Sequence, residues 1–345
     1  MIERKVIDRN SEIDFWKFSF SIVIVLLHSF NLFDGKNLYM PGGAIGVDFF
    51  FIVTGFLMVN TIYKNKCISG GDLLWRKFKT ICPYFYLSVV LAFVVRTVFE
   101  IDNAPMLHKI LLLINEILLL QAAGFGVYAV TGSAWYLSAM FLGIGILFPL
   151  VKNFGDSYNS SFAFIVSALI LGALSSSIGH TSNPGYMING IIFLGLLKGI
   201  AEISLGCFAY FVVHKVNSLK IGNNIKTLLT LLKYICFIFV IYFATLEESN
   251  SYLMFSCVGI LFIGIVLSFS NITYNIINKF YKLTNLLGQF SLSIYLNNYY
   301  WALIIGKVFN NYSNNQKLII YIIIVFISSI IINILAKLLK TKLGY

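Results

Sequence analysis

Long apolar stretches recur along the whole chain and alternate with short polar connections. Most of them approach the roughly 20 apolar residues that a helix needs to cross a membrane. A segment inside a bilayer must satisfy its backbone hydrogen bonds internally, which favours helices. The pattern therefore predicts an all-α polytopic membrane bundle of about ten transmembrane helices. These stretches are 14–33, 43–62, 82–99, 135–151, 161–178, 189–213, 228–246, 251–269, 288–309 and 318–336.

One further apolar stretch, 106–123, reads MLHKILLLINEILLLQAA and is short. It carries His108, Lys109 and Glu116, which a spanning helix would expose to hydrocarbon. If this stretch crossed the membrane, every later loop would change sides and the lysines of 215–226 would lie outside. We therefore predict an interfacial or re-entrant segment here.

Composition and charge agree with a membrane protein. The chain is 59% hydrophobic and only 11% charged, and its net charge is +11. The basic residues fall between the apolar stretches, and the outer side of the ten-span arrangement receives chiefly Lys36, Lys109 and Lys317. This asymmetry predicts a multi-pass protein of the cell membrane with both termini cytoplasmic. Membrane lipids are the expected partners, and nucleic acid is not. We expect one membrane-embedded domain, 1–345, and no metal, since the five cysteines lack ligand spacing.

The first apolar stretch carries a stripe of polar residues, Asp14, Lys17, Ser21 and His28. His28 follows Lys17 by eleven positions, which is about 20° from three full helical turns, so both side chains share a face about 16 Å apart. A cation near the cytoplasmic end can hold a phosphate, and an imidazole deeper in can act as a base. The alternative is that Lys17 reaches lipid headgroups and His28 makes a hydrogen bond within the bundle.

The second stretch begins GGAIGVDFFFIVTGFLM and places Asp48 at a depth similar to that of His28 on the preceding, antiparallel helix. A carboxylate beside the imidazole would fix its tautomer. A purely structural ion pair is the alternative. Further along, Lys198 and Glu202 lie four residues apart within one span and are expected to neutralise each other.

The connection before the third stretch, WRKFKTICPYFY, contains Arg76, Lys77 and Lys79. Such a cluster suits the phosphates of a nucleotide-like donor. It also suits an orientation signal or a contact with anionic lipid headgroups.

Taken in order, these segments resemble the acyltransferase family 3, multi-span bacterial enzymes that acylate envelope and secreted carbohydrates. EIDFWKFSFSIVIVLLH resembles the family's opening motif, and GVDFFFIVTGFLM its second motif. RKFKTICPYFY, GSAWYLSAMFL and LLGQFSLSIYLNNYYW resemble later segments, up to about residue 301. Lys17 stands where many members have arginine, Thr80 where a second loop arginine is common, Met140 where glutamate is frequent and Asn298 where histidine is frequent.

The resemblance implies transfer of an acyl group, most often acetyl, from cytoplasmic acyl-coenzyme A to a sugar hydroxyl. His28 would serve as general base or transient acyl carrier, and Asp48 would orient it. Lys17, Arg76 and Lys79 would bind the donor phosphates.

The carbohydrate acceptor is expected to be exopolysaccharide, capsule, lipopolysaccharide or a wall glycan. Trp135, Ser138, Tyr295 and Asn298 are the candidates for binding it. An interfacial aromatic belt and ordinary interhelical hydrogen bonds are the alternatives for these four. A transporter or flippase of a lipid-linked saccharide is the rival function, although such proteins often have repeated halves and none is evident here.

Overall fold

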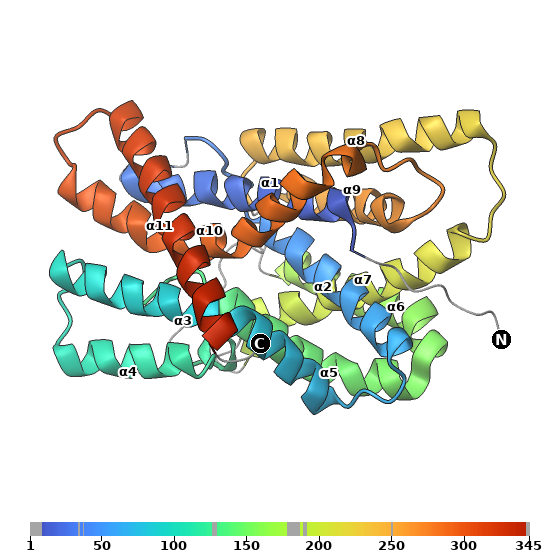
Figure 1. Cartoon of the computed structure of the whole chain (residues 1–345), viewed down its shortest axis with the longest axis horizontal. Helices are drawn as coiled ribbons and strands as arrows, with labels where there is room; N and C mark the ends of the chain where they lie inside the picture. The colour runs from blue at the N-terminus through green and yellow to red at the C-terminus, as the bar shows by residue number, and fades with distance from the viewer. Residues whose placement is uncertain are drawn as a thin grey trace.

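The computed structural model describes residues 9–33, 35–36, 38–125, 130–177, 187–188, 192–249 and 251–342. Helices make up nearly all of this part, and they pack lengthwise into one bundle (Figure 1). They are α1 Ser11–His28, α2 Ile45–Lys64, α3 Gly70–Val98, α4 Met106–Ile117, α5 Trp135–Ser157, α6 Ala163–Ser177, α7 Leu194–Val216, α8 Asn223–Leu246, α9 Tyr252–Phe269, α10 Tyr281–Val308 and α11 Asn314–Lys342. A short antiparallel pairing joins β1 Met187–Ile188 to β2 Ile192–Phe193.

Each of the predicted apolar stretches lies largely in a helix, so the predicted all-α membrane bundle is confirmed. In the described part, 8 helical units are long and apolar enough to cross a membrane. One of them, Trp135–Ser176, contains both α5 and α6. The chain breaks its helical path at Gly155 (φ 50°) and returns as α6 against α7. α10 is not among these 8 units, and it supplies the side chains described below.

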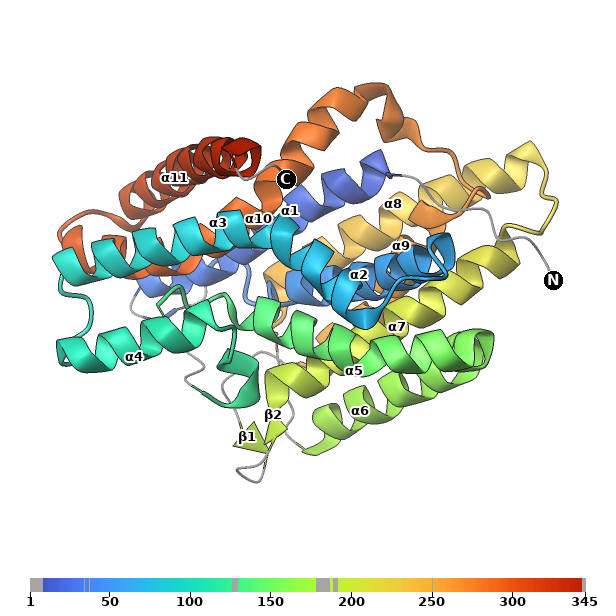
Figure 2. The ribbon, with the colours of Figure 1, turned by 60° about the horizontal axis from the view of Figure 1, so that its bottom comes forward.

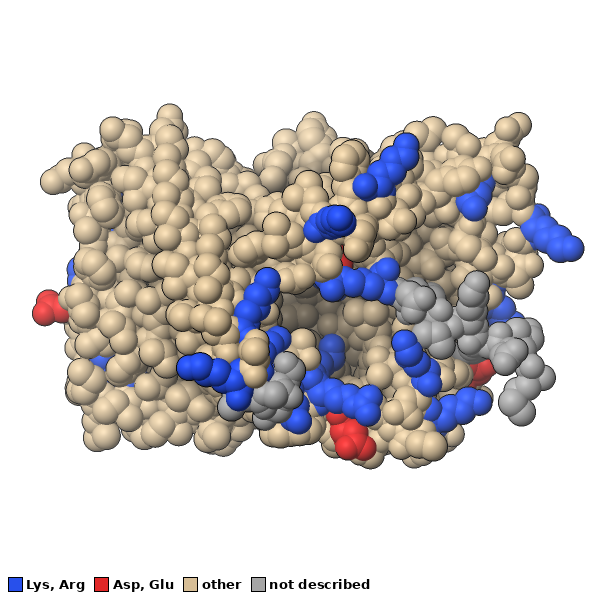
Figure 3. Space-filling view, viewed as in Figure 1, with Lys and Arg blue, Asp and Glu red and all other residues tan. Residues whose placement is uncertain are grey.

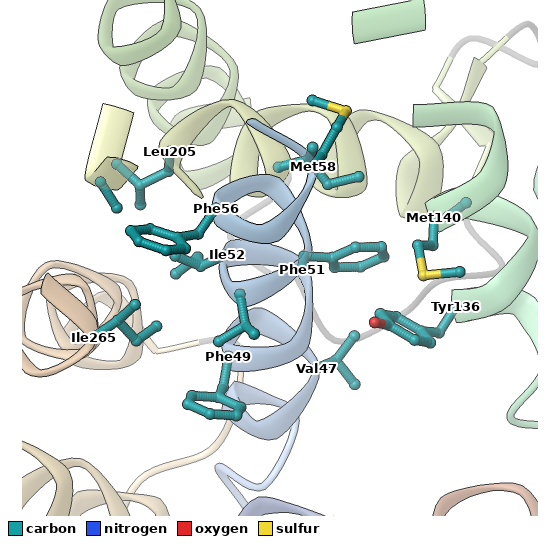
Figure 4. Close-up of a cluster of buried hydrophobic side chains, with 14 of the residues drawn as sticks. Val47, Phe49, Phe51, Ile52, Phe56, Met58, Tyr136, Met140, Leu205 and Ile265 are labelled. Atoms are coloured by element: carbon teal, nitrogen blue, oxygen red, sulfur yellow. The ribbon is translucent and has the colours of Figure 1, made fainter. Parts of the chain in front are cut away.

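The two most enclosed helices are α2 and α7. The apolar window of α2 is 83% buried and that of α7 is 67% buried, against 33% for α8 and α11 at the edge. Figure 4 shows apolar side chains of α2 together with Tyr136 and Met140 of α5, Leu205 of α7 and Ile265 of α9 around it. Gly55 and Gly206 let the two backbones meet, because a Cβ at either would overlap a carbonyl oxygen of the other helix, Ile203 or Ile52. The close crossing sets which face of α2 meets α7.

α1 and α10 run in the same direction and lie side by side over their length. Gly288 faces Asp14 near one end, and the Ser21 hydroxyl donates to the carbonyl of Ser291 at 3.0 Å further along. Beyond the end of α1, Gly306 lies against the carbonyl of Asn31. α10 is thus the neighbour that the polar stripe of α1 meets.

α4 has 12 residues, or about 18 Å of helix, which is shorter than the roughly 30 Å hydrocarbon core. It follows the end of α3 and returns beside it (Figures 1 and 2). Its outer face exposes Leu107 and Leu111, while Glu116 is fully buried. The Ser138 hydroxyl of α5 donates to the Leu119 carbonyl at 2.5 Å and so holds the end of this segment inside the bundle. A helix this short fits the predicted interfacial or re-entrant segment.

Candidate active site

α1 carries Lys17 and His28 without interruption between them. Asn10 caps the helix, since its side-chain oxygen accepts from the backbone N–H of Glu12 at 2.9 Å. Lys17 and His28 are only partly buried, whereas Phe20 between them is fully buried. The predicted face of α1, with about 16 Å between its two ends, is therefore present in the structure.

The imidazole of His28 meets the side-chain amide of Asn298 on α10. Nδ1 of His28 lies in hydrogen-bond contact with Oδ1 of Asn298. Nδ2 of Asn298 donates to the carbonyls of Ile294 at 3.1 Å and Tyr295 at 2.8 Å. Carbonyls only accept, so the amide oxygen must be the atom that faces His28. Nδ1 of His28 then carries the proton and Nε2 holds the lone pair, which makes Nε2 the basic and nucleophilic nitrogen.

Asp48 pairs with Lys198 instead of His28, which corrects the predicted orientation of the imidazole by this carboxylate. Asp48 Oδ1 lies 2.5 Å from Lys198 Nζ, and Glu202 Oε1 lies 3.9 Å from the same nitrogen. All three residues are buried between α2 and α7. A similar depth on consecutive helices does not bring the two side chains together, because Asp48 faces α7 while His28 faces α10. The alternative of a structural ion pair describes Asp48 better.

Lys17 lines a cavity of about 250 Å³ together with Arg9, Asp14 and Gly288; we call it the Lys17 cavity. Arg9 Nε lies 2.6 Å and Lys17 Nζ 3.5 Å from the Asp14 carboxylate. Lys77 of α3 is within electrostatic range of Lys17. Cations thus outnumber carboxylates here, which fits a phosphate-bearing ligand. Figure 3 shows a hollow near the middle of one face with lysine and arginine side chains around it.

Arg76 and Lys79 are predicted to bind the donor phosphates, but they do not line the Lys17 cavity. The supposed connection is helical, because α3 begins at Gly70 after a capping box formed by Ser69 and Asp72. Consecutive basic residues therefore point in different directions. Arg76 is exposed beside Asp72, and Lys79 Nζ lies 5.2 Å from the centre of the Trp75 ring. Lys77 is the member of this cluster that approaches Lys17.

The four predicted acceptor residues separate into two groups. Asn298 contacts His28, and Tyr295 lies one turn away with its hydroxyl donating to the Ser133 carbonyl at 2.8 Å. Trp135 instead packs against Gly195 of α7. The Ser138 hydroxyl is occupied by backbone groups of the segment after α4.

Sequence reasoning missed Tyr299. Its ring centre lies 5.1 Å from that of His28, nearly perpendicular to it at 86°. Gly132 (φ 73°) lies directly against the Tyr299 ring, where a Cβ would overlap it. The segment around Gly132 thereby reaches the surroundings of His28, and nothing in the spacing of LNNYYW distinguishes Tyr299 from its neighbours.

The structure is thus a multi-pass helical bundle with a histidine and a cationic cavity on one helix face. Residues 10–338 match the family model described as an acyltransferase domain, so the chain belongs to the acyltransferase family 3. It is similar to a peptidoglycan O-acetyltransferase of Listeria monocytogenes, with 23% identity over 169 residues. That match covers 47% of this chain and only 24% of the relative. No solved structure matches the chain.

Proposed function

We propose that the protein transfers an acyl group, in the simplest case acetyl, from cytoplasmic acyl-coenzyme A to a hydroxyl of a cell-surface or lipid-linked carbohydrate. The observation that carries the proposal is the fixed tautomer of His28, on the same face of α1 as Lys17. Family membership supports acyl transfer, and the similar protein from Listeria is named for acetylation of peptidoglycan.

The donor is assigned to the Lys17 end of α1. Lys17, Arg9 and Lys77 provide cations for its phosphates, and the excess of basic residues at this end supports a cytoplasmic orientation. A pantetheine arm of roughly 15–20 Å matches the rise of about 16 Å from Lys17 to His28. The thioester would therefore arrive beside the imidazole when the phosphates are bound at the cavity.

His28 performs the proton transfer in this proposal. Its Nε2 accepts the proton of the acceptor hydroxyl while the hydroxyl oxygen forms a bond to the thioester carbonyl carbon. Collapse of the tetrahedral intermediate breaks the carbon–sulfur bond, and the imidazolium returns the proton to the departing sulfur. The products are an ester and the free thiol of coenzyme A. Asn298 keeps Nδ1 protonated and stabilises the imidazolium by accepting its hydrogen bond.

Titration of acetyl-coenzyme A into the purified full-length protein tests the assignment of the donor. The wild type should bind it, and Lys17→Ala should weaken binding about 10- to 100-fold, as expected for a charged hydrogen bond. Lys17→Arg should restore most of the affinity. Lys64→Ala, an exposed lysine at the end of α2, is the matched control and should bind like the wild type. Absence of binding to the wild type would favour a transporter instead.

A further inference from the structure

A second cavity, of about 140 Å³, lies where α3 ends and α4 begins, at the opposite end of α3 from Lys77. It is lined by side chains that include Arg96, Thr97, Asp102, His108 and Lys109. We call it the Lys109 cavity. The mechanism proposed above uses none of these residues.

Arg96 gives this cavity a fixed wall. Its Nε and Nη2 donate to the two oxygens of Asp102 at 2.9 and 2.6 Å, and its Nη1 donates to the Val130 carbonyl at 2.6 Å. Lys109 brings a second cation, and His108 and Thr97 bring further hydrogen-bond donors. Among the lining residues two cations meet one carboxylate, and the Glu116 carboxylate near Arg96 is bound by Thr131 outside the lining. Lys109 therefore supplies positive charge for a ligand group that carries negative charge. Several donors around one small space suit the oxygens of a phosphate.

The helices beside the Lys109 cavity turn apolar side chains outward. On α3, Val94 and Val98 are 49% and 69% exposed. On α4, Met106 and Leu107 are 52% and 70% exposed. In a membrane protein such faces contact hydrocarbon chains. An anion site bordered by these faces suits an amphiphile with its phosphate in the cavity and its hydrocarbon chain along the helices.

The Lys109 cavity is also close to His28. Val130 lines the cavity, and two residues later Gly132 lies against the Tyr299 ring, whose centre is 5.1 Å from that of the imidazole. Two residues of chain span at most about 7 Å. The lining of the Lys109 cavity is therefore connected to the surroundings of the proposed base through Gly132 and Tyr299.

From this arrangement we infer that the Lys109 cavity binds the phosphate of a lipid-linked saccharide, which is the acyl acceptor. The inference rests on the proposed function and makes it more specific, since it selects a phosphate-linked amphiphile over a free polysaccharide.

Binding of farnesyl phosphate to the purified full-length protein in detergent tests this inference, with farnesol and inorganic phosphate as the comparison ligands. Farnesyl phosphate should bind, and Lys109→Gln should weaken it about tenfold or more, whereas Lys109→Arg should retain it. Lys36→Gln, an exposed lysine outside the cavity, is the matched control. Arg96 is left intact because its hydrogen bonds to Asp102 and Val130 hold the α3–α4 connection together. Equal binding of farnesol, or no effect of Lys109→Gln, would overturn the inference. Inorganic phosphate binding as tightly as farnesyl phosphate would contradict a lipid-linked ligand.

Acetyl-coenzyme A titrated into the same samples separates this inference from the proposed function. Lys109→Gln should leave the affinity for acetyl-coenzyme A unchanged, because the Lys17 cavity lies at the end of α1 that is far from His28. Binding of acetyl-coenzyme A without binding of farnesyl phosphate would overturn only the acceptor site. The reverse result would count against the proposed acyl donor.

Discussion

The amide of Asn298 turns its oxygen toward Nδ1 of His28 and its nitrogen toward two carbonyls of its own helix. The backbone of α10 therefore decides which way the amide points, and the amide decides which imidazole nitrogen is basic. An aspartate is the familiar residue for this task. Here a neutral side chain 270 positions away in the sequence is placed to perform it.

Replacement of Asn298 should slow the reaction without removing donor binding. We expect Asn298→Ala to lower kcat about 10²-fold, within the range of a general base that loses its correct protonation state. The KM for acetyl-coenzyme A should change little, because the Lys17 cavity is untouched. Asn298→Asp retains an acceptor for Nδ1 and should recover most of the rate. Release of the coenzyme A thiol in membrane vesicles measures both constants, and a changed KM with an unchanged kcat would refute the positioning role.

Lys77 should contribute more to donor binding than Lys79, because α3 turns Lys77 toward Lys17 and Lys79 toward Trp75. We expect Lys77→Ala to weaken acetyl-coenzyme A binding several-fold, up to about tenfold. Lys79→Ala serves as the matched control and should have little effect. Titration of the two purified variants gives the comparison. If Lys79→Ala weakened binding more than Lys77→Ala, the predicted role of Lys79 in donor binding would be supported instead.

The Asp48–Lys198–Glu202 cluster should matter for folding first. Lys198→Met leaves two buried carboxylates without a cation and should destabilise the protein by about 3–5 kcal/mol. Asp48→Asn should cost less, because Glu202 remains as a partner for the ammonium. The double variant with both Lys198→Met and Asp48→Asn should be more stable than Lys198→Met alone. Thermal unfolding of the purified proteins measures these differences.

A different outcome for Asp48 would revive its predicted catalytic role. If Asp48→Asn keeps the thermal midpoint of the wild type and still loses all activity, the carboxylate acts in the reaction rather than in the fold.

Glu116 should make stability depend on pH. It is fully buried and accepts hydrogen bonds from the N–H and hydroxyl of Thr131. Burial raises the pKa of Glu116 from 4.5 to about 7, although the hydrogen bonds and Arg96 oppose the shift. The folded protein then holds more protons than the unfolded chain between pH 4.5 and about 7, so stability falls as the pH rises through this window. The loss is on the order of 3 kcal/mol.

Glu116→Gln should remove this part of the pH dependence. The thermal midpoint, measured from about pH 4.5 to 7.5, should fall less steeply in this variant than in the wild type. The exposed Glu248→Gln serves as the control and should keep the wild-type slope. Parallel curves for all three proteins would show that Glu116 is not the group responsible.

Local patterns predicted the helices and the shared face of Lys17 and His28, because both depend on periodicity within one segment. The partner of His28 depends on which face of α1 meets which distant helix. Gly288 and Ser291 make that contact, and their significance appears only once α10 lies beside α1. For this reason Asp48, near in sequence and similar in depth, was the wrong choice, and Asn298 was grouped with the acceptor instead.

The basic cluster before Pro83 contained a signal that was available in the sequence. SGGD at 69–72 has the form of a capping box and marks the start of α3. A helix beginning there would have separated the directions of Lys77 and Lys79. Tyr299 had no comparable signal, because its contact with Gly132 and His28 arises from three separate segments.

The central claim is that His28 carries the acyl-transfer chemistry. Membrane vesicles supplied with radiolabelled acetyl-coenzyme A test it most directly, with His28→Ala compared with His214→Ala, a histidine at the end of α7. We predict that the wild type and His214→Ala pass label to glycan, while His28→Ala passes none, although it stays folded and binds the donor. Label transferred by His28→Ala at a rate near that of the wild type would contradict the claim.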